Sequence, residues 1–229
     1  APAHINPLAN NDFYDNVTSH RVINNFMIRG GDPTGTGTGG STLGKFDDQF
    51  NTDLQFNRPG LLAMAKSTDD TNDSQFFITE TASRSLDFQH TIFGVLVEGD
   101  AVREAISNVS VDANKKPINT VTMSSVDVIQ DVENGVLMLK AGEGQPGAAD
   151  ITVTVTDSNG NTYTQTFHVT VTADTINSNP FLSDIPQIRT IQGVQVAFAV
   201  TAQDADPNPS NTPIAYLGQG ALSANNIYI

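Results

Sequence analysis

The second half of the chain alternates strictly between apolar and polar residues. Residues 151–156 and 162–171 each follow a period of two, and the segment 157–161, Asp-Ser-Asn-Gly-Asn, separates them. Two such runs around an Asn-Gly turn predict a β-hairpin. A third alternating run, residues 194–201, follows a Pro-containing connector over residues 177–186. Short strands at this spacing are typical of a β-sandwich, which we therefore expect here.

Short apolar runs mark the first half of the chain. The predicted strands cover residues 22–29, 60–65, 74–79, 90–97 and 120–128, and the last is expected to close the sheet. One helix is predicted over residues 100–106. Val102, Ala105 and Ile106 would form its apolar face, and Asp100 can cap its first turn. The pattern indicates a mainly β fold, an antiparallel β-barrel with peripheral helices.

The composition of the sequence changes near Asp131, from Gly-rich segments to runs of Thr and Val. We place the boundary between the two parts at residues 131–135. The predicted organisation is a barrel domain over residues 1–130, a hairpin-rich sandwich segment over residues 131–176, and the start of a second sandwich repeat over residues 177–229. The strands that would complete this second repeat do not follow, so we expect a truncation at the C-terminus.

Charge and composition exclude several classes of function. Residues 1–130 carry 9 basic and 16 acidic side chains and residues 131–229 carry 2 and 9, so both parts are acidic and neither is expected to bind nucleic acid. Cysteine is absent, which removes disulfides, thiolate metal sites and cysteine nucleophiles. No apolar run has the length of a membrane span, and the opening residues lack the features of a signal peptide.

Five sequence blocks in the first half recur in one order. They are Phe13–Asp32, Gly35–Gly40 with Phe46–Asp48, Pro59–Ala65, Asn72–Ile78 and Leu86–Gly94. In content and spacing these blocks resemble the cyclophilin family. The resemblance implies a cyclophilin-like barrel and a peptidyl-prolyl cis-trans isomerase, which uses no cofactor and acts on proline-containing polypeptides.

Isomerisation requires rotation about the X-Pro amide, against a barrier of roughly 18 to 20 kcal/mol. The rotation needs no proton transfer and no covalent intermediate. In the twisted amide the prolyl nitrogen regains a lone pair, so a fixed cationic donor stabilises that state more than the planar one. Arg21 matches the catalytic arginine of the family. The resemblance therefore assigns this role to Arg21.

The other candidate site residues form a pocket and a groove by resemblance. Phe26, Met27, Phe77, Leu86 and His90 match the positions that hold the proline ring, and Ala65 and Gln75 match those that hold the substrate backbone. On spacing alone, the two phenylalanines and the methionine would be core residues and His90 a structural histidine.

Arg29 is also a candidate substrate-binding residue, at a position where the family usually has a glutamine that orients the substrate carbonyl. An arginine can donate hydrogen bonds but cannot accept them, and it adds a second cation beside Arg21. We expect reduced turnover or a preference for acidic flanking residues. The alternative is a degenerate cyclophilin fold that only binds proline-containing segments, as an adhesion or scaffold module. Lys66 also replaces a usual asparagine, and Ser85 a frequent tryptophan.

The family has further residues before the first helix, in which Ala1 would already lie, so we expect the chain to be a fragment of a longer protein. Residues 132–229 resemble the immunoglobulin-like and cadherin-like repeats of bacterial surface proteins. This second resemblance implies an extracytoplasmic location. It also makes Asp204 and Asp206 weak candidates for calcium binding, since calcium prefers hard oxygen ligands in loops. No other metal is expected.

Overall fold

The computed structural model describes residues 1–131, 135–142, 146–183 and 201–206. These residues form two units. The first comprises the described parts of Ala1–Val132 and Ser178–Ile229, and the second lies within Glu133–Asn177. Among the described residues, no helix has the length and apolar character needed to cross a membrane.

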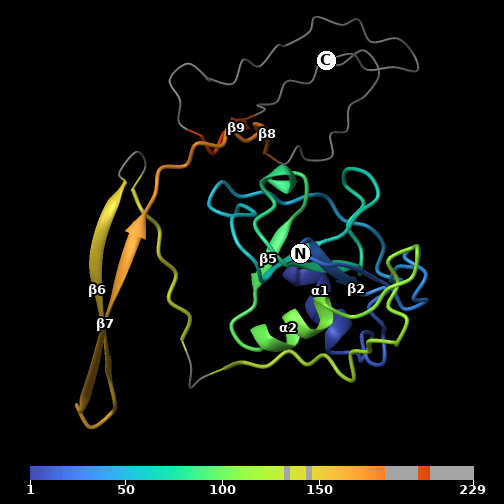
Figure 1. Cartoon of the computed structure of the whole chain (residues 1–229), viewed down its shortest axis with the longest axis horizontal. Helices are drawn as coiled ribbons and strands as arrows, with labels where there is room; N and C mark the ends of the chain where they lie inside the picture. Colours follow the sequence, from blue (N-terminus) through green and yellow to red (C-terminus); the bar gives the residue numbers. More distant parts are fainter. Residues whose placement is uncertain (132–134, 143–145, 184–200, 207–229) are drawn as a thin grey trace, which may run out of the picture. The chain divides into compact units, whose positions relative to one another are not determined.

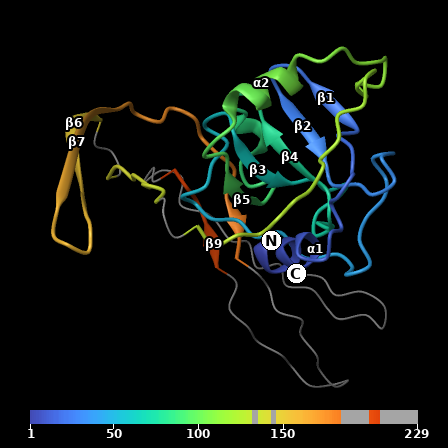
Figure 2. The same cartoon turned by 90° about the horizontal axis from the view of Figure 1, so that it is seen from below.

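The first unit is built on one antiparallel sheet of five short strands (Figure 2). In spatial order the strands are β1 (Arg21–Ile23), β2 (Met27–Gly30), β4 (Phe76–Thr79), β3 (Leu61–Met64) and β5 (Ile92–Val95). Its helices are α1 (Pro2–Ala9), the 3-10 turn η1 (Arg84–Leu86) and α2 (Asp100–Ser107). The predicted mainly β fold with few helices is thus confirmed.

The apolar run 22–29 was wrongly predicted as one strand, because it folds into a tight hairpin. Asn25 adopts a left-handed φ of 58°, and the Phe26 amide donates to the Ile23 carbonyl at 3.0 Å. Asparagine tolerates this conformation better than most residues. The turn brings β2 back along β1, with Ile23 opposite Met27.

The sheet is not closed by residues 120–128 as predicted. Within the described residues, this run makes a single bridge, between Thr122 and Thr18, and the Met123 amide donates to the Val17 carbonyl at 2.9 Å. Strands β1 and β5 therefore remain the two edges of the sheet. Farther along, Val126 packs instead against the cluster formed by Leu8, Ala9 and Tyr14.

Helix α2 forms where it was predicted, but it buries the opposite face. Val102 is 62% exposed, whereas Arg103 is only 7% exposed because it pairs with the carboxylate of Glu80. A buried ion pair cannot be separated without leaving an uncompensated charge, so it determines which face turns inward. Gly99 occupies the N-cap, and Asp100 pairs with Arg103 rather than capping the helix.

The loop after β2 is organised around Asp32, whose side chain is fully buried. Its carboxylate accepts hydrogen bonds from the backbone amides of Thr34 at 2.8 Å, Thr36 at 3.1 Å and Gly39 at 3.1 Å. The Gly37 amide and the Thr34 hydroxyl also donate to it. Burial alone would raise the pKa of Asp32, but these donors outweigh it and hold the pKa well below its usual range.

Replacement of this carboxylate is expected to destabilise the first unit. At pH 7, Asp32→Asn should lower the free energy of unfolding by about 2 to 4 kcal/mol, because an amide group cannot accept from every donor around it. The native pKa is depressed, so the difference from wild type is present above about pH 4 and shrinks as the pH falls below it. Urea unfolding at several pH values measures this, with exposed Asp12→Asn as control. Equal stabilities at pH 7 would contradict the account.

The second unit contains the predicted hairpin, which is confirmed (Figure 1). Strands β6 (Gly147–Thr156) and β7 (Thr162–Val171) pair along their full length, with Val155 opposite Tyr163 and Ile151 opposite Phe167. This register places apolar side chains on one face and threonines on the other. The apolar face is largely exposed in the described residues, Tyr163 at 68% and Val155 at 60%.

Most of the predicted second repeat lies outside the described residues, including all but the last residue of the run 194–201. Two short strands are described, β8 (Phe181–Leu182) and β9 (Ala202–Gln203), and they pair antiparallel. They group with the first unit. The sandwich therefore stays a prediction.

Candidate functional site

Three antiparallel pairings align the predicted site residues in one row across the sheet. Arg21 on β1 lies opposite Arg29 on β2, and Arg29 lies opposite Phe77 on β4. The row continues to Ala63 on β3. Residues directly opposite each other in a sheet project from the same face. The predicted catalytic arginine therefore shares a face with the predicted pocket.

The residues predicted to form the proline pocket gather at one buried apolar cluster. Met27, Ala65 and Phe77 belong to it, and Phe26 and Leu86 pack against it while remaining partly exposed. The structure thus brings together five of the predicted site residues. Beneath them the ring of Phe56 stacks on Phe77, with centroids 5.9 Å apart. This stacked pair holds the Phe77 ring in a fixed orientation.

His90 lies against the same apolar cluster. Its ring meets Phe77 edge-on at 5.3 Å, and its Nδ1 atom lies 2.9 Å from the Met64 carbonyl oxygen. Such a contact holds Nδ1 as the donor and leaves Nε2 as the free nitrogen. Burial lowers the pKa of His90, so the ring is neutral at pH 7. A neutral ring presents an apolar surface to a proline.

Arg29 does not point freely into the groove. Its Nε and Nη2 atoms donate to the side-chain oxygen of Gln75 at 3.0 and 2.7 Å, and the Gln75 amide donates to the Gly39 carbonyl at 2.7 Å. The predicted substrate-binding glutamine is thus already occupied on both of its polar atoms. Burial, and then the charge of Arg21, lower the pKa of Arg29.

The arginine of the edge strand, Arg21, has a different environment. Its side chain is exposed, and it has no hydrogen-bond or ion-pair partner among the described residues. The two arginines therefore divide their roles, since Arg29 is engaged by Gln75 whereas the donors of Arg21 are available. This is what a group that stabilises a transient lone pair requires.

His20, the residue before Arg21, was not predicted as a site residue. It is 7% exposed, and neither ring nitrogen has a hydrogen-bond partner among the described residues. Burial lowers its pKa, and the nearby charge of Arg29 adds to the effect. A protonated His20 would place a further cation among the arginines. Burial and Arg29 therefore favour the neutral form of His20.

Stability is expected to depend on the protonation of His20. Its native pKa lies below the unfolded value of about 6.5, so the unfolded chain takes up more protons as the pH falls below that value. The free energy of unfolding should therefore decrease between pH 7.5 and pH 5, and His20→Gln should reduce that decrease. Unfolding measured across this range by circular dichroism tests the sign. An unchanged or steeper decrease in the variant would contradict it.

Lys66, another departure from the family, is engaged in ion pairs. Its ammonium contacts the buried carboxylate of Asp48 and lies 3.0 Å from Asp69. Asp48 also accepts from the side chain of Asn72 at 2.9 Å. The carboxylates of Asp48 and Asp69 thus neutralise the charge of Lys66. Among the described residues, no group of three or more acidic or histidine side chains could hold a metal ion.

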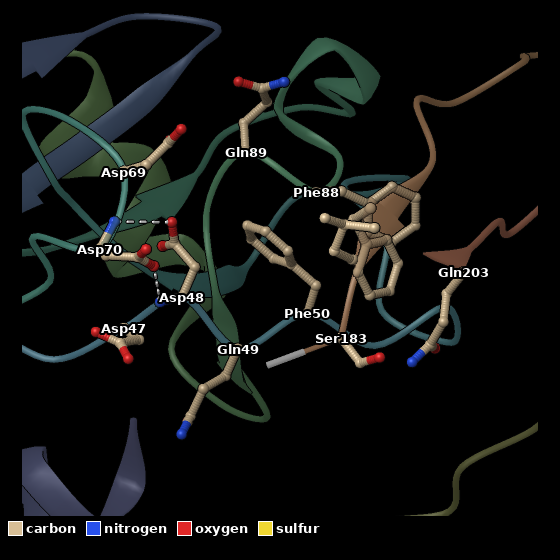
Figure 3. Close-up of a pocket in the computed structure, with 12 residues that line it drawn as sticks. Asp47, Asp48, Gln49, Phe50, Asp69, Asp70, Phe88, Gln89, Ser183 and Gln203 are labelled. Carbon is tan, nitrogen blue, oxygen red and sulfur yellow. Dashed lines mark hydrogen bonds between the residues drawn. The ribbon is translucent and has the colours of Figure 1, made fainter. Parts of the chain in front are cut away.

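A pocket of about 860 Å³ opens beside this ion pair (Figure 3). One end is lined by aspartates, where Asp48 and Asp70 exchange backbone-to-carboxylate hydrogen bonds of 2.9 and 3.2 Å. The other end is lined by the rings of Phe50 and Phe88 and by residues of β8 and β9.

Asp87, next to the pocket residue Leu86, was missed by the sequence reasoning. It is 3% exposed, its carboxylate accepts from the Phe56 amide, and it pairs with Arg84. It therefore links the loop that carries Leu86 and His90 to the residue beneath the pocket floor. Its position beside Leu86 was the only signal in the sequence.

The calcium candidate Asp206 accepts from the Ser178 amide.

The fold and this row of residues define a cyclophilin-like protein, and comparison with known proteins agrees. Residues 4–128 match the family model described as cyclophilin type peptidyl-prolyl cis-trans isomerase/CLD. This match covers more than half of the chain. The chain belongs to the cyclophilin-type peptidyl-prolyl cis-trans isomerase family.

Named relatives share this region. Peptidyl-prolyl cis-trans isomerase A of Mycobacterium tuberculosis is 48% identical over 118 residues, which are 51% of this chain and 64% of the relative. A peptidyl-prolyl cis-trans isomerase of Arabidopsis thaliana is 42% identical over 124 residues, 53% of this chain and 76% of the relative. The chain thus spans less than two thirds of the mycobacterial proteins that it matches.

One solved structure has the same fold in this region. It is a cyclophilin type peptidyl-prolyl cis-trans isomerase of Cryptosporidium parvum, determined in the presence of the dipeptide Ala-Pro. Its sequence is 34% identical, and the two structures match with a TM-score of 0.55. The match covers 56% of this chain and 84% of that one.

Proposed function

We propose that the first unit catalyses cis-trans isomerisation of X-Pro bonds in polypeptides by stabilising the twisted amide, without a cofactor or a covalent intermediate. The observation that carries this is the juxtaposition of a free guanidinium, Arg21, with the apolar pocket around Phe77, in one row of a paired sheet. The crystal structure of the Cryptosporidium parvum relative in the presence of Ala-Pro supports the same ligand class.

Each part of the site has a defined task in this mechanism. Phe26, Met27, Phe77 and Leu86 enclose the proline ring, and the neutral ring of His90 completes the wall. With the ring held, the residue before proline rotates, and the prolyl nitrogen becomes pyramidal. A hydrogen bond from Arg21 to that nitrogen exists only in the twisted state, so it lowers the barrier rather than strengthening ground-state binding. Ala65, beside Gln75, lines the path of the substrate backbone.

Removal of the free guanidinium should abolish most of the catalysis. Arg21→Ala is expected to lower kcat/KM for an Ala-Pro peptide by about 100-fold, the effect of losing one preorganised donor. A protease-coupled assay measures this rate, with Arg58→Ala as a control because Arg58 is exposed and outside the row. The claim fails if the wild type does not accelerate isomerisation, or if both variants behave alike.

A second candidate, a proline-binding module with little catalysis, is favoured by one observation. Arg29 donates to the side-chain oxygen of Gln75, and the side-chain amide of Gln75 donates to Gly39, so only one N–H of that glutamine is left for a substrate carbonyl. Such a module would still bind proline-containing segments through the apolar pocket.

Arg29→Gln distinguishes the two functions, because it frees Gln75 without altering the apolar pocket. If the wild type is an isomerase, the variant should change kcat by no more than about threefold, under 1 kcal/mol in barrier. A tenfold or greater rise in kcat at unchanged peptide affinity, measured by titration calorimetry, would instead assign the native chain to the binding function.

For the rest of the chain, we infer sandwich repeats that tether the isomerase outside the cytoplasm and that bind calcium through Asp204 and Asp206. The exposed apolar face of the hairpin, with Val155, Tyr163 and Phe167, supports a sandwich, since a two-stranded hairpin needs a second sheet to bury such a face. Fractionation of the cells tests the location, and a parent protein found in the cytoplasmic fraction would contradict it.

A further inference from the structure

Two short segments beyond the family match fold back on each other and on the first unit. We call the described residues 178–183 and 201–206 the clasp. Phe181 lies opposite Gln203 in the β8–β9 pair, and the Ser183 amide donates to the Thr201 carbonyl at 2.8 Å. The Ser178 amide closes the other end by donating to Asp206. The clasp is therefore held by its own hydrogen bonds.

The apolar contact of the clasp is a cluster of three aromatic rings. Phe181 stacks on Phe88 with centroids 4.7 Å apart and meets Phe50 edge-on at 5.5 Å. Phe50 and Phe88 also meet edge-on, at 6.4 Å. Figure 3 shows Phe50 and Phe88 at the end of the pocket where Ser183 and Gln203 lie. Offset and edge-on arrangements are those that aromatic rings prefer.

The polar contact of the clasp is Ser178, which is 6% exposed. Its hydroxyl donates to the Asp87 carboxylate at 3.3 Å and accepts from Arg84 at 3.4 Å. The same carboxylate accepts from the Phe56 amide, and the Phe56 ring stacks on Phe77 in the pocket floor. A buried hydroxyl with both a donor and an acceptor is a satisfied contact.

The two contacts hold a segment that contributes to the candidate proline pocket. Asp87 and Phe88 lie between Leu86 and His90, whose side chains form the wall of that pocket. The His90 amide donates to the Leu86 carbonyl at 3.3 Å, and this hydrogen bond closes the turn between the two residues. Phe50, Phe88 and His90 also line one small cavity of about 10 Å³, so the aromatic cluster of the clasp lies next to His90.

We propose that the clasp is a positioning element of the isomerase, in which Phe181 and Ser178 fix the loop 84–90 and thereby the proline-holding wall. The proposal rests on the proposed function. It assigns residues outside the family match to the binding of substrate. The clasp touches neither Arg21 nor Arg29, so it acts on how the proline is held and not on stabilisation of the twisted amide.

The docking itself can be measured without any turnover, because the chain contains no tryptophan. In the full chain, Phe181→Trp provides a single tryptophan, which can be excited selectively, in the aromatic cluster. A docked indole should emit at shorter wavelength than free tryptophan and be shielded from acrylamide. Phe88→Ala in the same background should shift the emission to longer wavelength and increase quenching. Emission of a solvent-exposed indole in Phe181→Trp would overturn the proposal.

The positioning role is tested by separating KM from kcat. Phe181→Ala should raise KM for an Ala-Pro peptide about three- to tenfold and change kcat by less than twofold, and Ser178→Ala should act in the same direction. Phe181→Trp should retain wild-type KM, because an aromatic ring is preserved. Ile176→Ala is the matched control, since Ile176 is exposed just before the clasp.

The possible results separate the two claims. A KM unchanged by Phe181→Ala, with the indole docked, would show that the clasp binds but does not position, and would overturn the inference. If the protein has no isomerase activity, peptide Kd replaces KM, and a weaker Kd in Phe181→Ala would still support it. An equal loss of kcat in Phe181→Ala and Ile176→Ala would indicate a general effect on folding and would contradict the inference.

Discussion

The antiparallel register of β1, β2 and β4 is the constraint on which the candidate site depends. It sets Arg21, Arg29 and Phe77 directly opposite one another, so that a free cation and an apolar pocket share a face. A slip of one residue would turn each side chain to the other face. The register is specified by the tight turn at Asn25, and by burial of the Val22–Ile28 pair on the opposite face.

This register also creates an electrostatic cost, because it places two guanidinium groups opposite each other. The structure reduces the cost by separating their tasks. Arg29 is half-buried and bound to Gln75, while Arg21 stays exposed, and His20 and His90 are kept neutral by burial. In this row of the described sheet, Arg21 is thus the guanidinium whose donors are available to a substrate. A single available donor is sufficient for stabilising a twisted amide, since no proton has to be transferred.

The sequence predicted what depends on local pattern and on matched blocks. The strands around Phe77 and His90 and the hairpin 147–171 are such features, and the pocket residues assemble as the resemblance implied. Features that depend on distant partners were not predictable. Helix α2 turns Arg103 inward because Arg103 pairs with Glu80, which lies 23 residues earlier in the sequence. Phe181 lies in a strand of only two residues, which is too short to show an alternating pattern.

The central claim is that this row of residues accelerates rotation about X-Pro bonds. Two-dimensional NMR exchange spectroscopy of an Ala-Pro peptide measures it most directly, with the full chain present at a small fraction of the peptide concentration. We predict exchange cross-peaks between the cis and trans proline signals on a sub-second timescale. Exchange that remains at the uncatalysed rate, with a lifetime of about tens to hundreds of seconds, would contradict the account.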